Sequence, residues 1–301
     1  MTREHRSVRW KKVTLVGVGL LGGSLGKALR TRRLADSVVG FVRRAASVRE
    51  CKAASAVDSA TLDLRSAVAE ADLVVLCTPI AQMQPLVKEM LPALRRHAIV
   101  TDVGSVKASL VRQLENPLAK AGVYFVGSHP MAGAEKMGVS AATNHLFEDA
   151  ICIVTPTLNS HKPAVRMVEE LWRSVGSRVL RLTPAAHDAL LSRSSHLPHV
   201  VAAELSNYVL GTNSSTKQAL LCANGFRDTT RIASGSPEMW RDIALANREH
   251  LLDALGDFMA DLQAFQRILK KGDAEKISRF FENAKQRRDR WARKMGSPSP
   301  E

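Results

Sequence analysis

A histidine stands where an apolar stretch of the sequence gives way to glycine-rich chain. His129 lies within "VGSHPMAGAEKMG", residues 126–138, with a proline directly after it and glycines on both sides. An imidazole has a pKa of about 6.5, so it can accept or donate a proton near neutral pH. Glycines beside it let the backbone approach a ligand closely. The pattern predicts a residue that handles a proton at the edge of a binding site.

A second pattern consists of three glycines in "VGVGLLGG", residues 16–23, between an apolar strand-like stretch and a helical one. Their Gly-x-Gly-x-x-Gly spacing permits a tight turn, a close approach of backbone to a pyrophosphate, and close packing of the helix on the strand. The loop therefore predicts a bound dinucleotide, although a glycine-rich turn without a ligand would show the same spacing. The residues expected to contact the dinucleotide are Gly17, Gly19, Leu20, Leu21 and Gly22.

Two arginines follow the second predicted strand, where an NAD site usually has an acidic residue that binds the ribose 2′-hydroxyl. The stretch "VVGFVRRAAS", residues 38–47, carries Arg43 and Arg44 at this place and no carboxylate. A guanidinium can donate two hydrogen bonds to a phosphate, which favours the 2′-phosphate of NADP. We therefore expect NADP as the cofactor, with NAD possible. The alternative is that both are ordinary surface arginines.

Polar residues also end two further predicted strands. Thr78 and Pro79 follow "VVLC", and Asp102 and Ser105 lie in "IVTDVGSVK". In a doubly wound sheet the carboxyl ends of the strands face the crevice that holds ligands. We expect Thr78, Pro79 and Asp102 at the cofactor, on the same edge as His129.

The elements that position these residues alternate along the first part of the chain. Strand-like stretches separated by helical patterns are typical of right-handed βαβ units and a parallel sheet. From Pro184 onward the pattern is helical throughout. We predict an α/β protein with an N-terminal Rossmann-type doubly wound domain, residues 1–183, and an all-helical substrate and dimerisation domain, residues 184–301. The predicted strands are "KVTLVGVG", "SVVGFV", "DLVVLCTP", "AIVTDVGS", "VYFVGS", "AICIVTP" and "SRVLRLTP".

An apolar seam runs through the last part of the chain at spacings of three and four residues, as in a helical bundle or coiled coil. Such a seam requires another helix to cover it. We expect a homodimer formed through the helical domain; the alternative is a second helix of the same chain. The seam consists of Leu251, Leu255, Phe258, Leu262, Phe265 and Leu269.

Composition limits the class of protein. The 301 residues are 45% hydrophobic, as in a folded chain of about two domains. No run reaches the roughly 18 apolar residues that span a bilayer, so no membrane partner is expected. A short basic and apolar N-terminal stretch resembles a signal peptide, but its apolar run carries the glycine pattern. The four cysteines form no CxxC pair, which favours a reducing cytoplasm and argues against structural zinc.

The net charge of +14 raises nucleic acid as a partner. The basic residues are scattered except at the two ends, and no zinc finger or RNA-binding motif accompanies them. We therefore favour a solvated basic surface and expect no nucleic-acid partner.

Seven motifs together resemble one enzyme family. They are "GLLGGSLG", "CTPI", "TDVGSVK", "GSHPMAGAEKMG", "HLPHVVA", "GFRDTTRIA" and "MWRDIALAN". In order and spacing, across about residues 13–270, the chain resembles the prephenate/arogenate dehydrogenase family. The resemblance implies oxidative decarboxylation of prephenate or arogenate, with hydride transfer to NAD(P)⁺, in tyrosine biosynthesis.

The resemblance also implies roles for single residues. His129 is similar to the family's catalytic histidine, which accepts a hydrogen bond from the substrate ring hydroxyl, and Ser105 to the serine that contacts both. Arg231 resembles the arginine that binds a substrate carboxylate, with Arg227 as the second candidate. The other residues expected in the substrate pocket are His196, His199 and Glu135.

Other interpretations of these residues remain open. His196 and His199 could be a metal-binding or purely structural pair, although the reaction requires no metal and none is expected, and either arginine could form a surface salt bridge. Ala134 stands before Glu135 where many members of the family carry threonine, which leaves the choice between prephenate and arogenate open. The rival functions are another NADP-dependent two-domain dehydrogenase, acting on a 3-hydroxy acid or an imine, and a non-catalytic NADP sensor.

Overall fold

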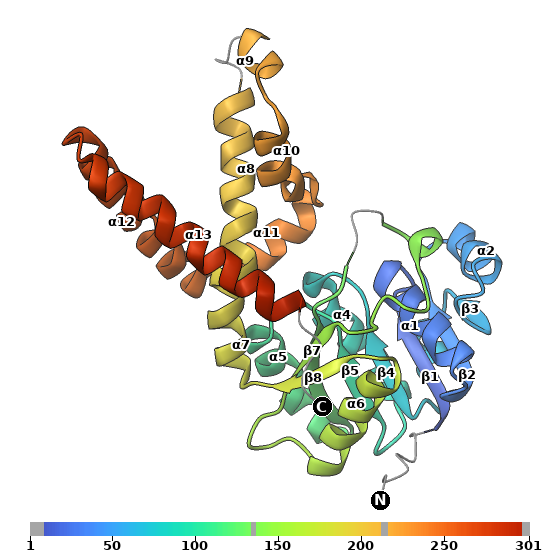
Figure 1. The fold of residues 1–301 in the computed structure, drawn as a ribbon. Coiled ribbons are helices and arrows are strands. Elements are labelled where there is room, and N and C mark those ends of the chain that lie inside the picture. Colours follow the sequence, from blue (N-terminus) through green and yellow to red (C-terminus); the bar gives the residue numbers. More distant parts are fainter. Residues whose placement is uncertain (1–8, 134–136, 212–215, 297–301) are drawn as a thin grey trace, which may run out of the picture. The chain divides into compact units, whose positions relative to one another are not determined.

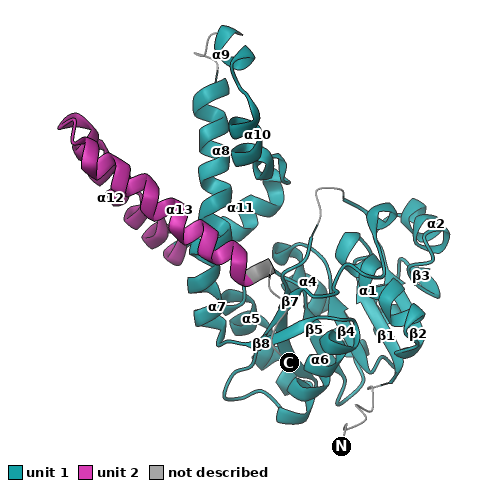
Figure 2. Cartoon of the chain, in the orientation of Figure 1, with its two compact units in different colours: residues 1–248 teal, residues 249–301 magenta. Residues whose placement is uncertain are grey.

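The computed structural model describes residues 9–133, 137–211 and 216–296 (Figure 1). The chain forms two compact units, residues 1–248 and residues 249–301 (Figure 2). The first unit contains the sheet and the helices that follow it as far as α11, and the second contains the last two helices.

The sheet is the centre of the first unit. Within the described residues it has eight strands in the order β3-β2-β1-β4-β5-β6-β7-β8. Neighbouring strands are parallel except for β6 and β7. The strands are β1 (Trp10–Val16), β2 (Ala35–Phe41), β3 (Ser59–Thr61), β4 (Leu73–Leu76), β5 (Ile99–Asp102), β6 (Tyr124–Pro130), β7 (Ile151–Thr155) and β8 (Arg178–Arg181).

Helices cover both faces of this sheet because each central strand is apolar on both sides. One buried cluster joins the sheet to α1, α2 and α6, and another joins it to α3, α4 and α5. This arrangement confirms the predicted Rossmann-type fold. The helices are α1 (Leu20–Thr31), α2 (Ala45–Ala53), α3 (Leu64–Val68), α4 (Ile80–Met90), α5 (Ala108–Lys120) and α6 (Lys162–Ser174), with short 3₁₀ turns η1 (Leu91–Ala93) and η2 (Val139–Ala141).

The sheet departs from the sequence prediction at two places. The expectation of a parallel sheet is wrong between β6 and β7, which pair antiparallel. The reason is that no crossover helix separates them: the described part of the connection holds only η2, so the chain returns along the strand it has just left. The edge strand β3 was not predicted, because three residues are too few to show a strand pattern.

Helices follow the last strand, as predicted, and no strand occurs among the described residues after β8. Thr183 caps α7 by accepting a hydrogen bond from the amide of Ala186, and Pro184 takes the first helical position. A π-helical turn, η3 (Ser192–His196), joins α7 to α8. The remaining elements of this unit are α7 (Pro184–Leu191), α8 (Leu197–Leu210), α9 (Thr216–Leu220), α10 (Asn224–Thr230), η4 (Arg231–Ser234) and α11 (Pro237–Ala246).

The change from strands to helices lies between Arg181 and Pro184, whereas the two compact units divide after Arg248. The predicted domain boundary at 183/184 therefore stays a prediction. Among the described residues, no helix is long and apolar enough to cross a membrane.

The second unit is a pair of helices, α12 (Arg248–Lys270) and α13 (Ala274–Gly296). Gly272, with a φ of 63°, lies in the turn between them. Phe265 of α12 packs on Phe280 and Phe281 of α13, at ring-centroid distances of 4.4 and 5.9 Å. Part of the predicted seam is thus covered by the same chain. An exposed apolar row remains on α12, and it comprises Leu262 and Leu269 of the seam together with Leu252 and Met259.

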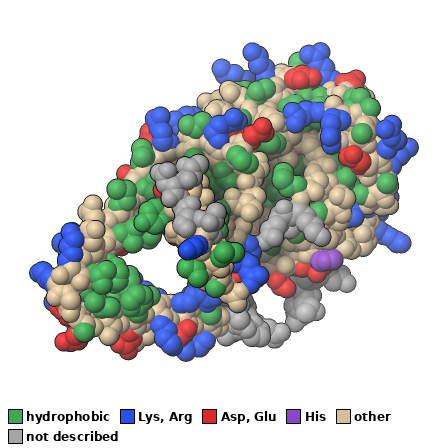
Figure 3. All heavy atoms as spheres, turned by 90° about the horizontal axis from the view of Figure 1, so that it is seen from above, with side chains coloured by type: hydrophobic (Ala, Val, Ile, Leu, Met, Phe, Trp, Pro, Cys, Tyr) green, Lys and Arg blue, Asp and Glu red, His purple; other side chains and the backbone are tan. Residues whose placement is uncertain are grey.

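Figure 3 shows charged side chains of both signs on one face of the molecule. On the face drawn in Figure 3, Lys and Arg side chains lie among acidic and apolar ones. The expectation of a solvated basic surface without a nucleic-acid partner stays a prediction.

Close packing of α1 against the turn between α2 and β3 gives a test of the fold. A Cβ added to Gly26 would lie 2.1 Å from the backbone oxygen of Ala56, whereas one added to Gly225 of α10 would meet no atom within 4 Å. We expect Gly26→Ala to lower the free energy of unfolding by about 1–3 kcal/mol, because the overlap forces α1 outward. Gly225→Ala is the matched control and should leave stability unchanged or slightly higher. Urea unfolding measures both, and equal stabilities of the two variants would contradict the packing.

Candidate active site

The glycine loop connects β1 to α1 with the geometry that a dinucleotide requires. Gly17 has a φ of 97°, which favours glycine. A Cβ on Gly22 would lie 2.1 Å from the Gly17 carbonyl oxygen, whereas one on Gly19 would point into open space. The first and third glycines are thus required by the fold, and the second leaves room for a ligand against the backbone.

The start of α1 is prepared for an anion. Gly19 is its N-cap and no side chain caps the helix, and its first turn has no acidic residue. The unpaired amides and the helix dipole therefore favour negative charge there. Thr78 lies beside Gly17, and its hydroxyl is buried without a hydrogen-bond partner among the described residues. The exposed Pro79 follows as the N-cap of α4. These groups fit the pyrophosphate and adjoining ribose of a nicotinamide dinucleotide.

Both predicted cofactor arginines are exposed after β2. Arg43 makes no ion pair with a described residue. Arg44 is the N-cap of α2, and its guanidinium lies 3.8 Å from the Glu50 carboxylate with the side chain 74% exposed. Neither arginine is held by a strong partner, so both can turn toward an anion.

His129 lies near the carboxyl end of β6 and is 8% exposed. Its Nδ1 is 2.8 Å from Nε2 of His187, and Nδ1 of His187 is 2.7 Å from the Asp188 carboxylate. That carboxylate also accepts hydrogen bonds from the backbone amides of Lys107 and Ala108, both at 2.8 Å. Three elements, β6, α7 and the start of α5, therefore meet at this histidine.

A buried ion pair supports the strand end that carries His129. The Lys107 ammonium contacts the Asp102 carboxylate and donates to the Ser128 carbonyl oxygen at 2.8 Å. Asp102 also accepts from the amides of Gly104 and Ser128, and the Ser128 hydroxyl accepts from the Trp172 indole at 3.0 Å. We expected Asp102 at the cofactor, but its carboxylate is fully buried and bonded to these groups. Its geometry supports a positioning role.

Burial sets the protonation of the histidines. It lowers the pKa of His129 well below its usual value, and His187, Lys107 and His196 lower it further. Burial also lowers the pKa of His187, although the hydrogen bond to Asp188 opposes this, and it lowers the pKa of His196 to about 4. All three rings are neutral at pH 7, so His129 can accept a proton from a ligand.

The two predicted pocket histidines differ in their surroundings. His196 has its Nδ1 3.0 Å from the Asn247 amide nitrogen, and its Nε2 is buried without a partner among the described residues. His199 bonds through Nδ1 to the Ser195 carbonyl oxygen and stacks on Trp240 at 3.7 Å. No set of three potential ligands to a metal occurs in the described part of the chain.

The predicted substrate arginines are exposed. Arg231 begins η4, and Arg227, on α10, donates to the Asn224 side chain. Arg227 forms no hydrogen bond or ion pair with His129 among the described residues. Ser105 is half-buried in the turn after β5, and its backbone lies beside His196. Glu135 lies outside the described residues.

Comparisons with known proteins place this geometry in a family. Residues 25–181 match the nucleotide-binding domain of prephenate dehydrogenase, and residues 183–283 match its dimerization domain. The chain belongs to the prephenate dehydrogenase family. Members of this family are NAD(P)-dependent oxidoreductases, and so is this chain.

Individual relatives agree with this assignment. The chain is 33% identical to a cyclohexadienyl dehydrogenase of Zymomonas mobilis, over 93% of this chain and 95% of the relative. It is 34% identical to a prephenate dehydrogenase of Bacillus subtilis, over 92% of this chain and 75% of that relative. The structure of a prephenate dehydrogenase from A. aeolicus, in complex with hydroxyphenyl propionate and NAD⁺, superposes with a TM-score of 0.88 at 32% identity, covering 95% of this chain and 99% of that one. The two rival functions proposed from the sequence are thereby set aside.

Several residues around His129 and the two pocket histidines in this family member were not predicted. They are His187, Asp188, Lys107, Asn247 and Trp240. The sequence holds a weak signal for His187 and Asp188, because this His-Asp pair follows the Thr-Pro start of a helix at Thr183. For Asn247 no local signal existed, because its contacts lie 51 and 59 residues away in sequence.

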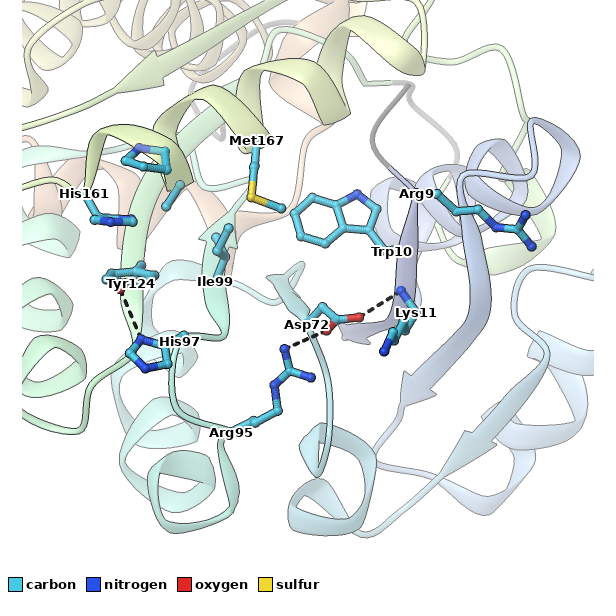
Figure 4. Close-up of a pocket in the computed structure, with 12 residues that line it drawn as sticks. Arg9, Trp10, Lys11, Asp72, Arg95, His97, Ile99, Tyr124, His161 and Met167 are labelled. Carbon is cyan, nitrogen blue, oxygen red and sulfur yellow. Dashed lines mark hydrogen bonds and ion pairs between the residues drawn. The ribbon is translucent and has the colours of Figure 1, made fainter. Parts of the chain in front are cut away.

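A separate hollow in this unit lies at the amino ends of the strands (Figure 4). Its volume is about 300 Å³, and Trp10, Tyr124 and Met167 line it together with the ion pair of Arg95 and Asp72. None of the predicted site residues lines it, and parallel sheets bind their ligands at the opposite edge.

Proposed function

We propose that this chain oxidatively decarboxylates prephenate or arogenate with NADP⁺ as cofactor, and that His129 acts at the reacting hydroxyl. The observation that carries the proposal is a neutral, buried histidine on the same sheet edge as the glycine loop. The hydroxyphenyl propionate in the A. aeolicus structure has the phenol ring that this reaction forms, which supports an aromatic product here.

The chemistry follows from this placement. The bound dinucleotide would accept a hydride from the ring carbon that carries the hydroxyl. As the hydride leaves, that carbon becomes electron-poor and the hydroxyl proton becomes acidic. His129 has one ring nitrogen, Nε2, without a partner among the described residues, so it can accept a hydrogen bond from this hydroxyl. Loss of CO₂ then returns an electron pair to the ring, which becomes aromatic, and the oxygen retains its proton as a phenol.

The choice of substrate rests on a small set of side chains. Prephenate and arogenate share the ring and differ at the side-chain carbon, where one has a ketone and the other an amine. Relatives of this chain include a cyclohexadienyl dehydrogenase and an arogenate dehydrogenase of Synechocystis, 31% identical with a TM-score of 0.78. We therefore propose both compounds as substrates. His196, His199 and Arg231 are our candidates for substrate contacts.

The function is tested by incubating the purified protein with prephenate or arogenate and NADP⁺ and following absorbance of the reduced cofactor. If His129 assists only as the hydroxyl proton shifts, His129→Asn should lower kcat by about a hundredfold or more and leave KM nearly unchanged. If Arg231 holds a substrate carboxylate throughout the reaction, Arg231→Ala should chiefly raise KM.

Circular dichroism of each variant serves as the control for folding. Rate loss at Arg231 with a normal KM, or a raised KM at His129 with a normal kcat, would show that the roles are assigned wrongly. Arg227→Ala would then be the next variant. Absence of turnover with both substrates and both cofactors would refute the function itself.

The preference for NADP rests on Arg43 and Arg44. Charge-assisted hydrogen bonds contribute about 1.5–3 kcal/mol each. We expect the double variant Arg43→Ala/Arg44→Ala to reduce the preference for NADP⁺ over NAD⁺ by about tenfold or more, measured as the ratio of kcat/KM values. Arg49→Ala is the matched control, because Arg49 is an exposed arginine on α2. It should leave the ratio of kcat/KM values for NADP⁺ and NAD⁺ unchanged. Equal or better kcat/KM with NAD⁺ in the unmodified enzyme would overturn the preference.

We also propose that the protein is a homodimer. The match to a dimerization domain and the exposed apolar row on α12 support this. We expect a dimer mass by light scattering and a shift toward monomer for Leu262→Glu, which places a charge in the row. Gln263→Glu, an exposed neighbour outside the row, should remain dimeric. A monomer mass for the unmodified protein at every concentration would count decisively against the dimer.

A further inference from the structure

We infer that His187 and Asp188 are positioning residues for His129: they hold its proton on Nδ1 and so keep Nε2 free to accept from the substrate. The inference rests on the proposed role of His129. It is carried by the side chains of His129, His187 and Asp188, which form a row here called the His-His-Asp row. A hydrogen bond of 2.8 Å joins His129 to His187, and one of 2.7 Å joins His187 to Asp188.

The direction of these hydrogen bonds follows from the last member of the row. The Asp188 carboxylate accepts from the amides of Lys107 and Ala108, at 2.8 Å each. An ionised carboxylate has no proton to donate, so Nδ1 of His187 must be the donor at this end. A neutral ring with its proton on Nδ1 carries a lone pair on Nε2. Nδ1 of His129 therefore has to donate to that lone pair.

The opposite arrangement is unfavourable. If His187 carried its proton on Nε2, its bare Nδ1 would face the Asp188 oxygen at 2.7 Å with no hydrogen between two acceptors. Burial also disfavours a doubly protonated His187, although Asp188 opposes this effect. The other charged or titratable groups near the row are Lys107, Asp102 and His196.

Asp188 is well placed to fix this direction because it also caps a helix. Helix α5 begins at Ala108, and its N-cap residue Lys107 provides no side-chain cap. The carboxylate of Asp188 takes that place and satisfies two amides that the helix leaves unpaired. The Asn247 side chain donates to the Asp188 carbonyl oxygen at 2.9 Å. Asp188 is 1% exposed, so water cannot readily replace these bonds.

The row has a consequence for the chemical step. When the substrate hydroxyl shares its proton with Nε2, the His129 ring gains positive charge. The negative Asp188 lies beyond His187, on the far side of the ring, and favours that charge, as in other carboxylate–histidine pairs. The proton returns to the oxygen when the ring becomes aromatic, so the row orients and polarises His129 and itself loses no proton.

Asp188→Asn is the sharpest test. The asparagine oxygen can still accept from the Ala108 amide. The side-chain NH₂ takes the place of the oxygen that accepts from His187 and from the Lys107 amide, so it donates to Nδ1 of His187 and the Lys107 amide loses its acceptor. That reverses both hydrogen bonds and moves the His129 proton to Nε2. We expect kcat to fall by about a hundredfold or more with KM nearly unchanged. Thr183→Ala is the matched control: it removes the cap of α7, the helix that carries Asp188, and should lower stability without changing kcat.

The tautomer can be observed directly and without substrate. Nitrogen-15 NMR of histidine-labelled protein, with the His129 signals identified from His129→Asn, should show the proton on Nδ1 in the unmodified enzyme and on Nε2 in Asp188→Asn. A proton on Nε2 in the unmodified enzyme would overturn the inference even if Asp188→Asn failed to fold. So would a folded Asp188→Asn with unchanged tautomer and kcat. An enzyme inactive on both substrates that still showed the Nδ1 tautomer would refute the proposed function alone.

Discussion

The active-site edge depends on the buried ion pair between Lys107 and Asp102. Both side chains are fully buried, and removing one partner of such a pair commonly costs about 3–5 kcal/mol because the other charge is left uncompensated. Asp102 ends β5, and Lys107 also bonds to the Ser128 carbonyl oxygen in β6. The two strands therefore cannot shift relative to each other without breaking the pair, and His129 is held directly beside it.

Lys107 connects two networks through different atoms. Its ammonium belongs to the sheet, whereas its backbone amide bonds to Asp188 in α7. The strand edge and the first helix after the sheet are thus fixed to one residue. His129 is supported on two sides: its backbone pairs with β7, and its ring bonds to His187. A reacting ring held in this way loses little freedom when a substrate binds.

Much of the fold and part of the site could be predicted from local pattern. Alternating apolar stretches predicted the doubly wound sheet, and the position of His129 after a strand predicted the edge on which it lies. Contacts between distant segments could not be predicted in this way. His187 lies 58 residues from His129, and nothing near either residue indicates the other. The polar end of β5 predicted Asp102 at the cofactor, but the pattern does not reveal that the carboxylate is buried in an ion pair with a lysine five residues later. The strand β7 was predicted, but its antiparallel direction was not, because its own sequence resembles that of a parallel strand.

The antiparallel pairing of β6 and β7 also matters for how such an enzyme can evolve. Because β7 runs back along β6, the connection at residues 131–150 begins and ends at the same edge, and the amide of Met131 closes it by bonding to the Ile151 carbonyl oxygen at 2.7 Å. A parallel strand would have required a crossover to the other edge. Insertions, deletions and substitutions in this connection can therefore reshape the space next to His129 while the sheet register stays as it is. New substrate specificities can arise by mutation of this one connection, while the hydrogen bonds between β6 and β7 are kept.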